Sequence, residues 1–122
     1  MYAIVDIETT GGYASANGIT EIAVYIHDGE RIVKHFETLI NPRQPIPYYI
    51  QSMTGITDDM VKDAPLFEDV ADKIYQLLHD KIFVAHNVNF DYSFIKSHLA
   101  ASNYSLNCKK LCTVRLSRKI FP

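Results

Sequence analysis

Cysteine, glycine and proline are all scarce in this sequence of 122 residues, which contains 2, 5 and 5 of them respectively. The low glycine and proline content, with 48% hydrophobic and 21% charged residues, excludes a collagen-like or intrinsically disordered chain. Cys108 and Cys112 lie in a basic segment, and no second cysteine pair or histidine cluster completes a zinc site. We therefore expect two reduced thiols, as in a protein of the cytoplasm.

The sequence also lacks a long apolar run and a basic leader. No stretch approaches the roughly 20 apolar residues that span a bilayer, and the segment from Met1 to Asp6 does not resemble a signal peptide. We therefore expect no membrane partner. A length of 122 residues suffices for one hydrophobic core, so residues 1–122 are predicted to form a single domain.

Acidic residues are missing from the end of the chain. All 14 of them lie in residues 1–91, which carry a net charge of −8, whereas residues 92–122 carry +6. A basic flank beside an acidic body is compatible with contacts to a phosphate backbone. A solvated helix face would produce the same charge pattern, so charge alone does not decide between them.

Three strand-like runs come first in the sequence. The run 2–8 is apolar and β-branched, which is typical of a buried central strand. The runs 19–27 and 31–40 are joined at Asp28-Gly29, a strong hairpin signal. Between the first and second runs, residues 9–18 are rich in Thr, Gly, Ser and Asn and are predicted to form a loop.

Helical spacing dominates the second half of the chain. Thr57 is a plausible N-cap, residues 67–79 form an amphipathic pattern and residues 89–101 a second one, with a short apolar strand at 82–85 between them. A further helix is expected to begin within 113–119. Antiparallel hairpin strands plus one parallel strand–helix–strand unit predict an α/β fold: a mixed sheet flanked by helices.

Asp6 and Glu8 are the first candidates for chemistry. Residues i and i+2 of a strand point to the same face, and two carboxylates on so apolar a strand are costly to bury without compensation. A divalent cation such as Mg²⁺ or Mn²⁺ compensates well, because it prefers oxygen ligands. The alternative is that both side chains lie at a solvent-exposed end of the strand.

A second candidate segment, residues 86–91, follows the strand 82–85 and opens a helix. Open α/β sheets place their ligands where strands end and helices begin. Asp91 would add a third carboxylate to Asp6 and Glu8 if the two strands are neighbours. The alternatives are a first-turn acid that complements the helix dipole for Asp91 and an N-cap for Asn87.

These segments resemble motifs of the DEDD superfamily of 3′→5′ exonucleases, and in particular the proofreading epsilon subunit of bacterial DNA polymerase III. The resemblance covers nearly the whole chain in order and approximate spacing. It is carried by Asp6-Ile7-Glu8-Thr9-Thr10-Gly11, Asn41-Pro42, Pro45-Ile46-Pro47, Met53-Thr54-Gly55-Ile56-Thr57, Ala85-His86-Asn87-Val88-Asn89-Phe90-Asp91 and Cys112-Thr113-Val114-Arg115-Leu116-Ser117-Arg118.

The resemblance implies a ribonuclease-H-like fold and a two-metal site with Mg²⁺ or Mn²⁺. Asp6 would bridge both ions, Glu8 would bind one ion and the 3′ end of the substrate, and Asp91 would order a metal site or its water. It also implies contacts of the terminal nucleotide with Thr9, Thr10, Gly11, Met53, His86, Asn87 and Phe90. Met53 is equally compatible with filling the core.

The implied reaction is hydrolysis of the 3′-terminal phosphodiester of DNA, which releases nucleoside 5′-monophosphates from a single-stranded or frayed end. The implied partners are a DNA polymerase subunit or a fused downstream domain. The third family motif, which supplies a histidine base and a fourth carboxylate, is absent, so residues 1–122 are expected to be a C-terminally incomplete domain with little activity alone. An RNA-trimming exonuclease and a non-catalytic nucleic-acid or polymerase-binding module remain alternatives.

Overall fold

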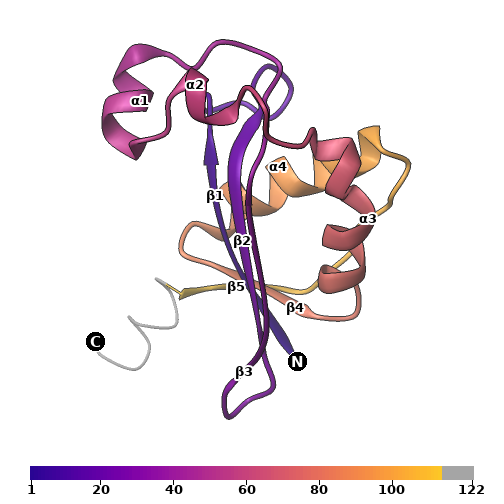
Figure 1. Ribbon diagram of the computed structural model, residues 1–122. Helices are drawn as coiled ribbons and strands as arrows, with labels where there is room; N and C mark the ends of the chain where they lie inside the picture. Colours follow the sequence, from indigo (N-terminus) through magenta and orange to yellow (C-terminus); the bar gives the residue numbers. More distant parts are fainter. Residues whose placement is uncertain (114–122) are drawn as a thin grey trace.

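The computed structural model describes residues 1–113, which form a five-stranded mixed sheet in the order β3-β2-β1-β4-β5 (Figure 1). The chain begins with a meander, because β2 pairs antiparallel with both β1 and β3. β4 pairs parallel with β1, and β5 pairs parallel with β4. The predicted mixed α/β sheet is confirmed; its strands are β1 (Tyr2–Thr9), β2 (Ile19–His27), β3 (Ile32–Leu39), β4 (Ile82–Ala85) and β5 (Lys110–Cys112).

Two helices cover one face of this sheet, α3 (Phe67–Leu78) and α4 (Val88–Ala101) (Figure 1). Their apolar sides and the inward residues of the strands form one core. Complete burial of aromatic and branched side chains at this contact is the main favourable contribution to folding, at roughly 1.5–3 kcal/mol for each large side chain. The most enclosed members include Ile22, Val24, Ile74, Leu78, Phe83, Phe94, Ile95 and Leu99.

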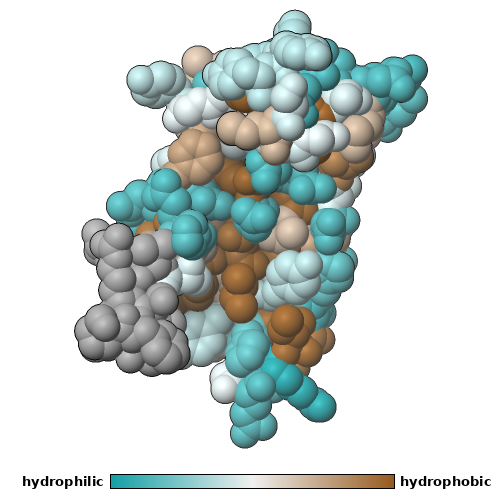
Figure 2. Space-filling model, turned by 90° about the vertical axis from the view of Figure 1, so that its left-hand side faces the viewer, coloured by the Kyte–Doolittle hydropathy of each residue, from teal (hydrophilic) through white to brown (hydrophobic). Residues whose placement is uncertain are grey.

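β1 separates a buried face from an open one. Ala3, Val5 and Ile7 point into the core, whereas Asp6 is exposed and Glu8 is half-buried. Period-two alternation of this kind is the geometry of a pleated strand. Figure 2 shows the side of the molecule that faces away from α3 and α4, where hydrophilic surface borders a central hydrophobic strip.

Two short helices, α1 (Tyr48–Thr54) and α2 (Asp58–Val61), lie beyond the end of β1 (Figure 1). They share a small separate core of Ile46, Ile50, Ile56 and Val61. As predicted, Thr57 caps α2: its hydroxyl accepts a hydrogen bond from the Met60 amide at 3.3 Å.

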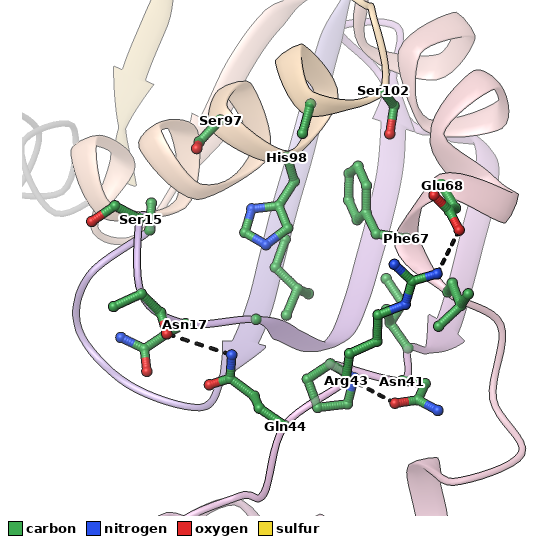
Figure 3. Close-up of a pocket in the computed structure, with 18 residues that line it drawn as sticks. Ser15, Asn17, Asn41, Arg43, Gln44, Phe67, Glu68, Ser97, His98 and Ser102 are labelled. Atoms are coloured by element: carbon green, nitrogen blue, oxygen red, sulfur yellow. Dashed lines mark hydrogen bonds and ion pairs between the residues drawn. The ribbon is translucent and has the colours of Figure 1, made fainter.

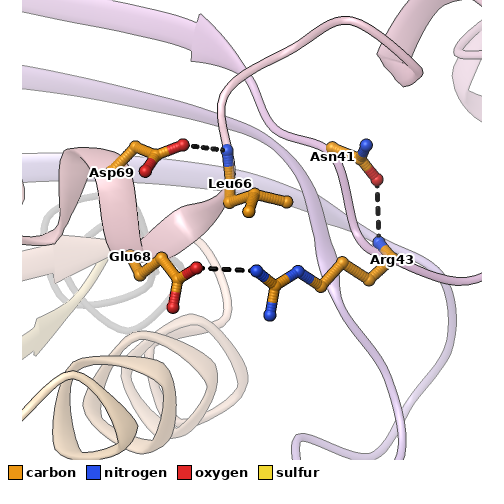
Figure 4. A network of polar contacts seen from close by, with 5 residues as sticks. All are labelled: Asn41, Arg43, Leu66, Glu68 and Asp69. Atoms are coloured by element: carbon orange, nitrogen blue, oxygen red, sulfur yellow. Dashed lines mark hydrogen bonds and ion pairs between the residues drawn. The ribbon is translucent and has the colours of Figure 1, made fainter.

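The connection from β3 is fastened to the start of α3 by polar contacts (Figure 4). The Arg43 guanidinium lies 2.6 Å from the Glu68 carboxylate, and the Arg43 amide donates to Asn41 Oδ1 at 2.9 Å. The Leu66 amide donates to Asp69 Oδ2 at 3.0 Å, which satisfies one of the otherwise unpaired groups at the start of the helix. These contacts fix the loop 41–47 against the helix layer.

Two elements were not predicted from the sequence, α1 and β5. The helix expected to begin within 113–119 lies outside the described residues, apart from Thr113. Cys108 and Cys112, both in the described part, are thiols rather than halves of a disulfide, as predicted. Among residues 1–113, no helix has the length and apolar character needed to cross a membrane.

Candidate active site

Asp6 and Glu8 occupy the last half of β1, where the strand has a paired edge and an open edge. Along one edge β2 continues the pairing, with Asp6 opposite Ala23 and Glu8 opposite Glu21. Along the other edge β4 pairs with β1 only as far as Ile4. The two carboxylates therefore lie on a part of the central strand that extends beyond its parallel neighbour.

Asp91 reaches this part of β1 from the first turn of α4. Its side chain is buried, with 7% of the residue exposed, and its carboxyl pKa is raised to about 6, chiefly by burial. The negative charge of Asp6 and, more weakly, that of Glu8 contribute to this increase, while a hydrogen bond from the Ile7 backbone opposes it. The structure thus places Asp91 within electrostatic reach of Asp6 and Glu8.

The acidic surface continues across the sheet onto β2 and β3. Burial, then Asp6 and Glu21, raise the pKa of Glu8; burial, then Glu37 and Asp6, raise that of Glu21. Sequence reasoning missed Glu21 and Glu37. These two glutamates are identified by the strand register, which places Glu21 opposite Glu8 and Glu37 opposite Ala23.

The chemistry of this set of oxygen donors fits a divalent cation. Within residues 1–113, no three His, Cys, Asp or Glu side chains lie close enough together to form a ready-made metal site. The carboxylates are neighbouring like charges rather than a closed ligand shell. Mg²⁺ and Mn²⁺ suit such a set, because they bind through one or two carboxylates and complete their coordination with water and substrate phosphates.

The loop 9–18 after β1 is held closed by hydrogen bonds of Thr10. Thr10 is 1% exposed; its hydroxyl lies 2.6 Å from Gln44 Oε1 and 3.2 Å from Asn17 Oδ1, and it accepts from the Gly18 amide at 3.0 Å. The Thr10 amide donates to the Gly18 carbonyl at 2.9 Å. Both the amide and the hydroxyl of Thr10 therefore hold the loop closed.

The neighbouring residues Thr9 and Gly11 support the same loop. The Thr9 hydroxyl donates to the Gly11 carbonyl at 2.8 Å, and Thr9 is buried. A Cβ atom at Gly11 would lie 2.5 Å from Asn17 Oδ1. Glycine at position 11 therefore accommodates the Asn17 side chain, which a Cβ atom at this position would displace; a sequence alone does not reveal this contact.

Met53 and Phe90 differ in their exposure. Met53 on α1 is 75% exposed, so the structure excludes a role as core filler. Phe90 is half-buried, packs against the core and lies with its ring centroid 4.9 Å from that of Phe94. Only part of Phe90 is therefore left for contact with a base.

His86 and Asn87 are both exposed at the start of α4. Asn87 occupies the N-cap position of α4, as the alternative expected, although its side chain makes no capping hydrogen bond. His86 Nδ1 lies 3.4 Å from Thr113 Oγ1, and its carbonyl accepts from the Cys112 thiol at 3.1 Å. These contacts tie the start of α4 to the end of β5.

A pocket of about 440 Å³ lies behind the loop 9–18, away from the three carboxylates (Figure 3). Its walls come from residues 14–19, 40–44 and 66–68 and from the second half of α4. His98 faces it, with Nδ1 bonded to the Phe94 carbonyl at 2.9 Å, and burial lowers the pKa of its imidazole. No local sequence pattern predicts this pocket, because its walls come from four separate segments.

The mixed sheet with antiparallel β1–β3, parallel β4 and β5, and helices packed on one face defines the ribonuclease-H-like class of exonuclease folds. Product-bound exonuclease I shares this fold with a TM-score of 0.85, 16% identity and coverage of 98% of this chain and 31% of that one. Residues 3–122 match the RNase_T exonuclease family, and the chain belongs to this family. It is of the DEDD type of 3′→5′ exonucleases, as the sequence motifs predicted.

Several named relatives share its sequence. The 3′-5′ exonuclease DinG of Bacillus subtilis (strain 168) is 39% identical over 123 residues, which cover 99% of this chain and 13% of DinG. A PolC-type DNA polymerase III of Caldanaerobacter subterraneus subsp. tengcongensis is 41% identical over 120 residues, 98% of this chain and 9% of the polymerase. This chain thus spans a small part of the curated relatives that it matches.

Among solved structures, exonuclease X in complex with 5′ overhanging duplex DNA is 31% identical with a TM-score of 0.79. The match covers 100% of this chain and 65% of exonuclease X. Sequence and fold therefore agree on the same class of nuclease.

Proposed function

We propose that this protein is a metal-dependent 3′→5′ exonuclease that hydrolyses the 3′-terminal phosphodiester of DNA and releases nucleoside 5′-monophosphates, in proofreading or repair. The observation that carries the proposal is the buried Asp91, whose pKa responds to Asp6 and Glu8 on the adjacent strand. Asp6 opposes the ionisation of both Glu8 and Asp91, a shared cation would offset this repulsion, and perturbed groups of this kind concentrate at functional sites.

Asp6, Glu8 and Asp91 are the residues that would hold Mg²⁺ or Mn²⁺. When bound, the ions supply electrostatic stabilisation of the attacking and leaving oxygens of the phosphodiester. The carboxylates contribute the negative charge that retains the ions, and the β1–β2 pairing positions Asp6 and Glu8. The Ile7 backbone positions Asp91.

DNA is the substrate that the comparisons favour. One relative is a DNA polymerase III, and the exonuclease X structure contains duplex DNA with a 5′ overhang. The partner is the 3′ end of a single-stranded or frayed DNA, since terminal bases must separate before the last nucleotide enters a site, at a cost of a few kcal/mol. A polymerase subunit or a fused domain is the proposed context in the cell.

The test uses the full-length protein with DNA labelled at the 3′ end, DNA labelled at the 5′ end and covalently closed circles. We expect Mg²⁺-dependent loss of the 3′ label first, intact circles, and faster digestion of single strands than of blunt duplexes. Asp6→Asn should abolish digestion without unfolding the protein, because Asp6 is exposed and the change keeps the size of the side chain.

The matched control is Asp63→Asn, the same change at an exposed aspartate of the described part that lies outside the carboxylate cluster. It should keep full activity. Cleavage of the circles, or stepwise loss from the 5′ end, would show that the assigned reaction is wrong. Equal loss of activity in both variants would remove Asp6 from the site.

A further inference from the structure

Two lysines from different elements contact one tyrosine ring on the helix that carries Asp91. Lys96 Nζ on α4 lies 5.8 Å from the centroid of the Tyr92 ring, and Lys110 Nζ on β5 lies 5.1 Å from it. Lys110 also donates to Asn89 Oδ1 at 3.3 Å. Both ammonium groups therefore lie within 5.8 Å of one ring centroid, and two positive charges from separate elements at one side chain favour an anion beside them.

Tyr92 provides a fixed surface for the two lysines. It is 8% exposed, its hydroxyl donates to the Leu106 carbonyl at 3.3 Å, and the same oxygen accepts from the Cys108 amide at 3.1 Å. Lysine stems that rest on a rigid aromatic face keep their ammonium groups in solvent near one place. The cations are thus positioned before any ligand arrives.

The chain segment that contains this pair carries positive charges only. Within residues 92–113 the charged side chains are Lys96, Lys109 and Lys110, and no acid is present. All three lysines are exposed, and none forms an ion pair with a carboxylate of the described residues. By contrast, Lys62 pairs with Asp59 at 2.9 Å.

The helix that carries Lys96 also carries Asp91 in its first turn, but on another face. Asn89, Tyr92 and Lys96 follow one another at i, i+3 and i+7, and therefore share a face of α4, while Asp91 points to β1. Seven residues of helix span roughly 10 Å. That length corresponds to about three nucleotides of a strand with a rise of roughly 3.4 Å each.

We propose that Lys96, Lys110 and Asn89 form a phosphate-binding track for the part of a single nucleic-acid strand that follows its terminal nucleotide. The inference rests on the proposed function, because it assigns the path of the substrate outside the carboxylate site. Contacts of this kind fix the position of the strand without reading its bases. Binding through the track is therefore independent of base sequence and weakens as salt increases.

The test is the salt dependence of binding by the full-length protein, measured by fluorescence anisotropy with a short single-stranded oligonucleotide in EDTA, where metal-dependent cleavage cannot proceed. Each single-strand phosphate contact contributes about 0.7 to the slope of log affinity against log salt. We expect Lys96→Ala and Lys110→Ala each to reduce the slope by about that amount, and Lys→Arg at either position to retain it.

Lys73→Ala is a matched control, because Lys73 also lies over an aromatic ring, with Nζ 5.5 Å from the centroid of Phe36, but on the side of α3 and β3. It should leave the slope unchanged. Unchanged slopes in both track variants, or an equal decrease in the Lys73 variant, would overturn the track.

Hydrolysis of the p-nitrophenyl ester of thymidine 5′-monophosphate with Mn²⁺ separates this inference from the proposed function. This substrate has a single phosphate, so the track variants should hydrolyse it at the wild-type rate while they bind the oligonucleotide more weakly. Normal ester hydrolysis with unchanged oligonucleotide binding would refute the track alone. Absence of ester hydrolysis in the wild type, with binding that still depends on Lys96 and Lys110, would refute the nuclease proposal alone.

Discussion

Asp91 is a carboxyl group whose ionisation the fold opposes, and stability should therefore depend on pH. Its pKa is 3.8 in the unfolded reference and about 6 in the fold. The folded state retains the proton over this window, so the free energy of unfolding should decrease as pH rises from about 4 to about 6 and level off above that range. The change is at most about 3 kcal/mol, since one pKa unit corresponds to about 1.4 kcal/mol.

Urea unfolding in EDTA at several pH values measures this effect. Asp91→Asn, which cannot ionise, should flatten the dependence and raise stability near pH 7. Asp63→Asn, at an exposed position, should behave as the wild type does. A wild-type protein that becomes more stable between pH 4 and pH 6, with the Asp91 variant following it, would contradict the assignment.

Thr10 and Thr20 are equally buried, each 1% exposed, but their hydroxyl groups differ in hydrogen bonding. The Thr10 hydroxyl bonds Gln44 and the Gly18 amide, whereas the Thr20 hydroxyl is buried without a hydrogen-bond partner among the described residues. Thr10→Val should cost about 1–3 kcal/mol because it leaves buried polar groups unsatisfied. Thr20→Val should be neutral or stabilising, because it removes a polar group that is already unsatisfied.

Chemical denaturation of both variants under the same conditions decides this comparison. The expected order of stability is Thr20→Val at or above the wild type, and Thr10→Val clearly below it. Equal destabilisation would mean that valine is excluded by shape at both positions, and that the Thr10 hydroxyl does not close the loop.

At the scale of elements, α1 depends on the glycine that ends it. Gly55 has a φ of 76° and its amide bonds the Gln51 carbonyl at 2.8 Å, a left-handed C-cap. Gly55→Ala should destabilise the protein by about 1 kcal/mol, because a Cβ atom is disfavoured in this conformation. Thermal unfolding measures the loss; Gly12→Ala, where no atom lies within 4 Å of the new Cβ, is the control and should change little.

The short elements α1 and β5 could not be predicted from the sequence. Long segments with a clear period, β1 to β3, α3 and α4, were predicted to within about two residues. α1 has 7 residues and follows Pro47, which makes no side-chain cap, so periodicity was too short to detect it. β5 has three residues and is held by its pairing with β4, a tertiary contact that no local pattern contains.

At the scale of the whole molecule, some residues of the candidate site are predictable from local sequence patterns and others depend on contacts between distant segments. Asp6 and Glu8 follow from strand alternation, and Asp91 from a strand–helix junction, so the sequence could propose all three. Glu21, Glu37 and the hydrogen bond between Thr10 and Gln44 depend on strand register and loop closure across the fold. Their roles became visible only with the tertiary structure.

The carboxylates gathered here are three, and residues 1–122 show no later motif that matches the family's histidine base and fourth acid. We therefore propose that residues 1–122 alone have little exonuclease activity, since a positioned acid or base contributes about 10²–10⁴-fold. Digestion of a 3′-labelled oligonucleotide in Mg²⁺, compared with the full-length protein, is the measurement. Robust digestion by purified 1–122, lost in its Asp6→Asn variant, would show that three carboxylates are sufficient.

The unequal lengths of β1 and β4 have a consequence for spectroscopy. β4 stops pairing at Ile4, so the Ile7 amide bonds a carboxylate where a neighbouring strand would otherwise accept it. Its proton resonance should therefore move as Asp91 gains or loses charge, and its exchange with deuterated solvent should slow when the carboxylate is ionised. One backbone amide thus reports the protonation and ligand state of the site in a solution NMR spectrum, without any introduced label near the carboxylates.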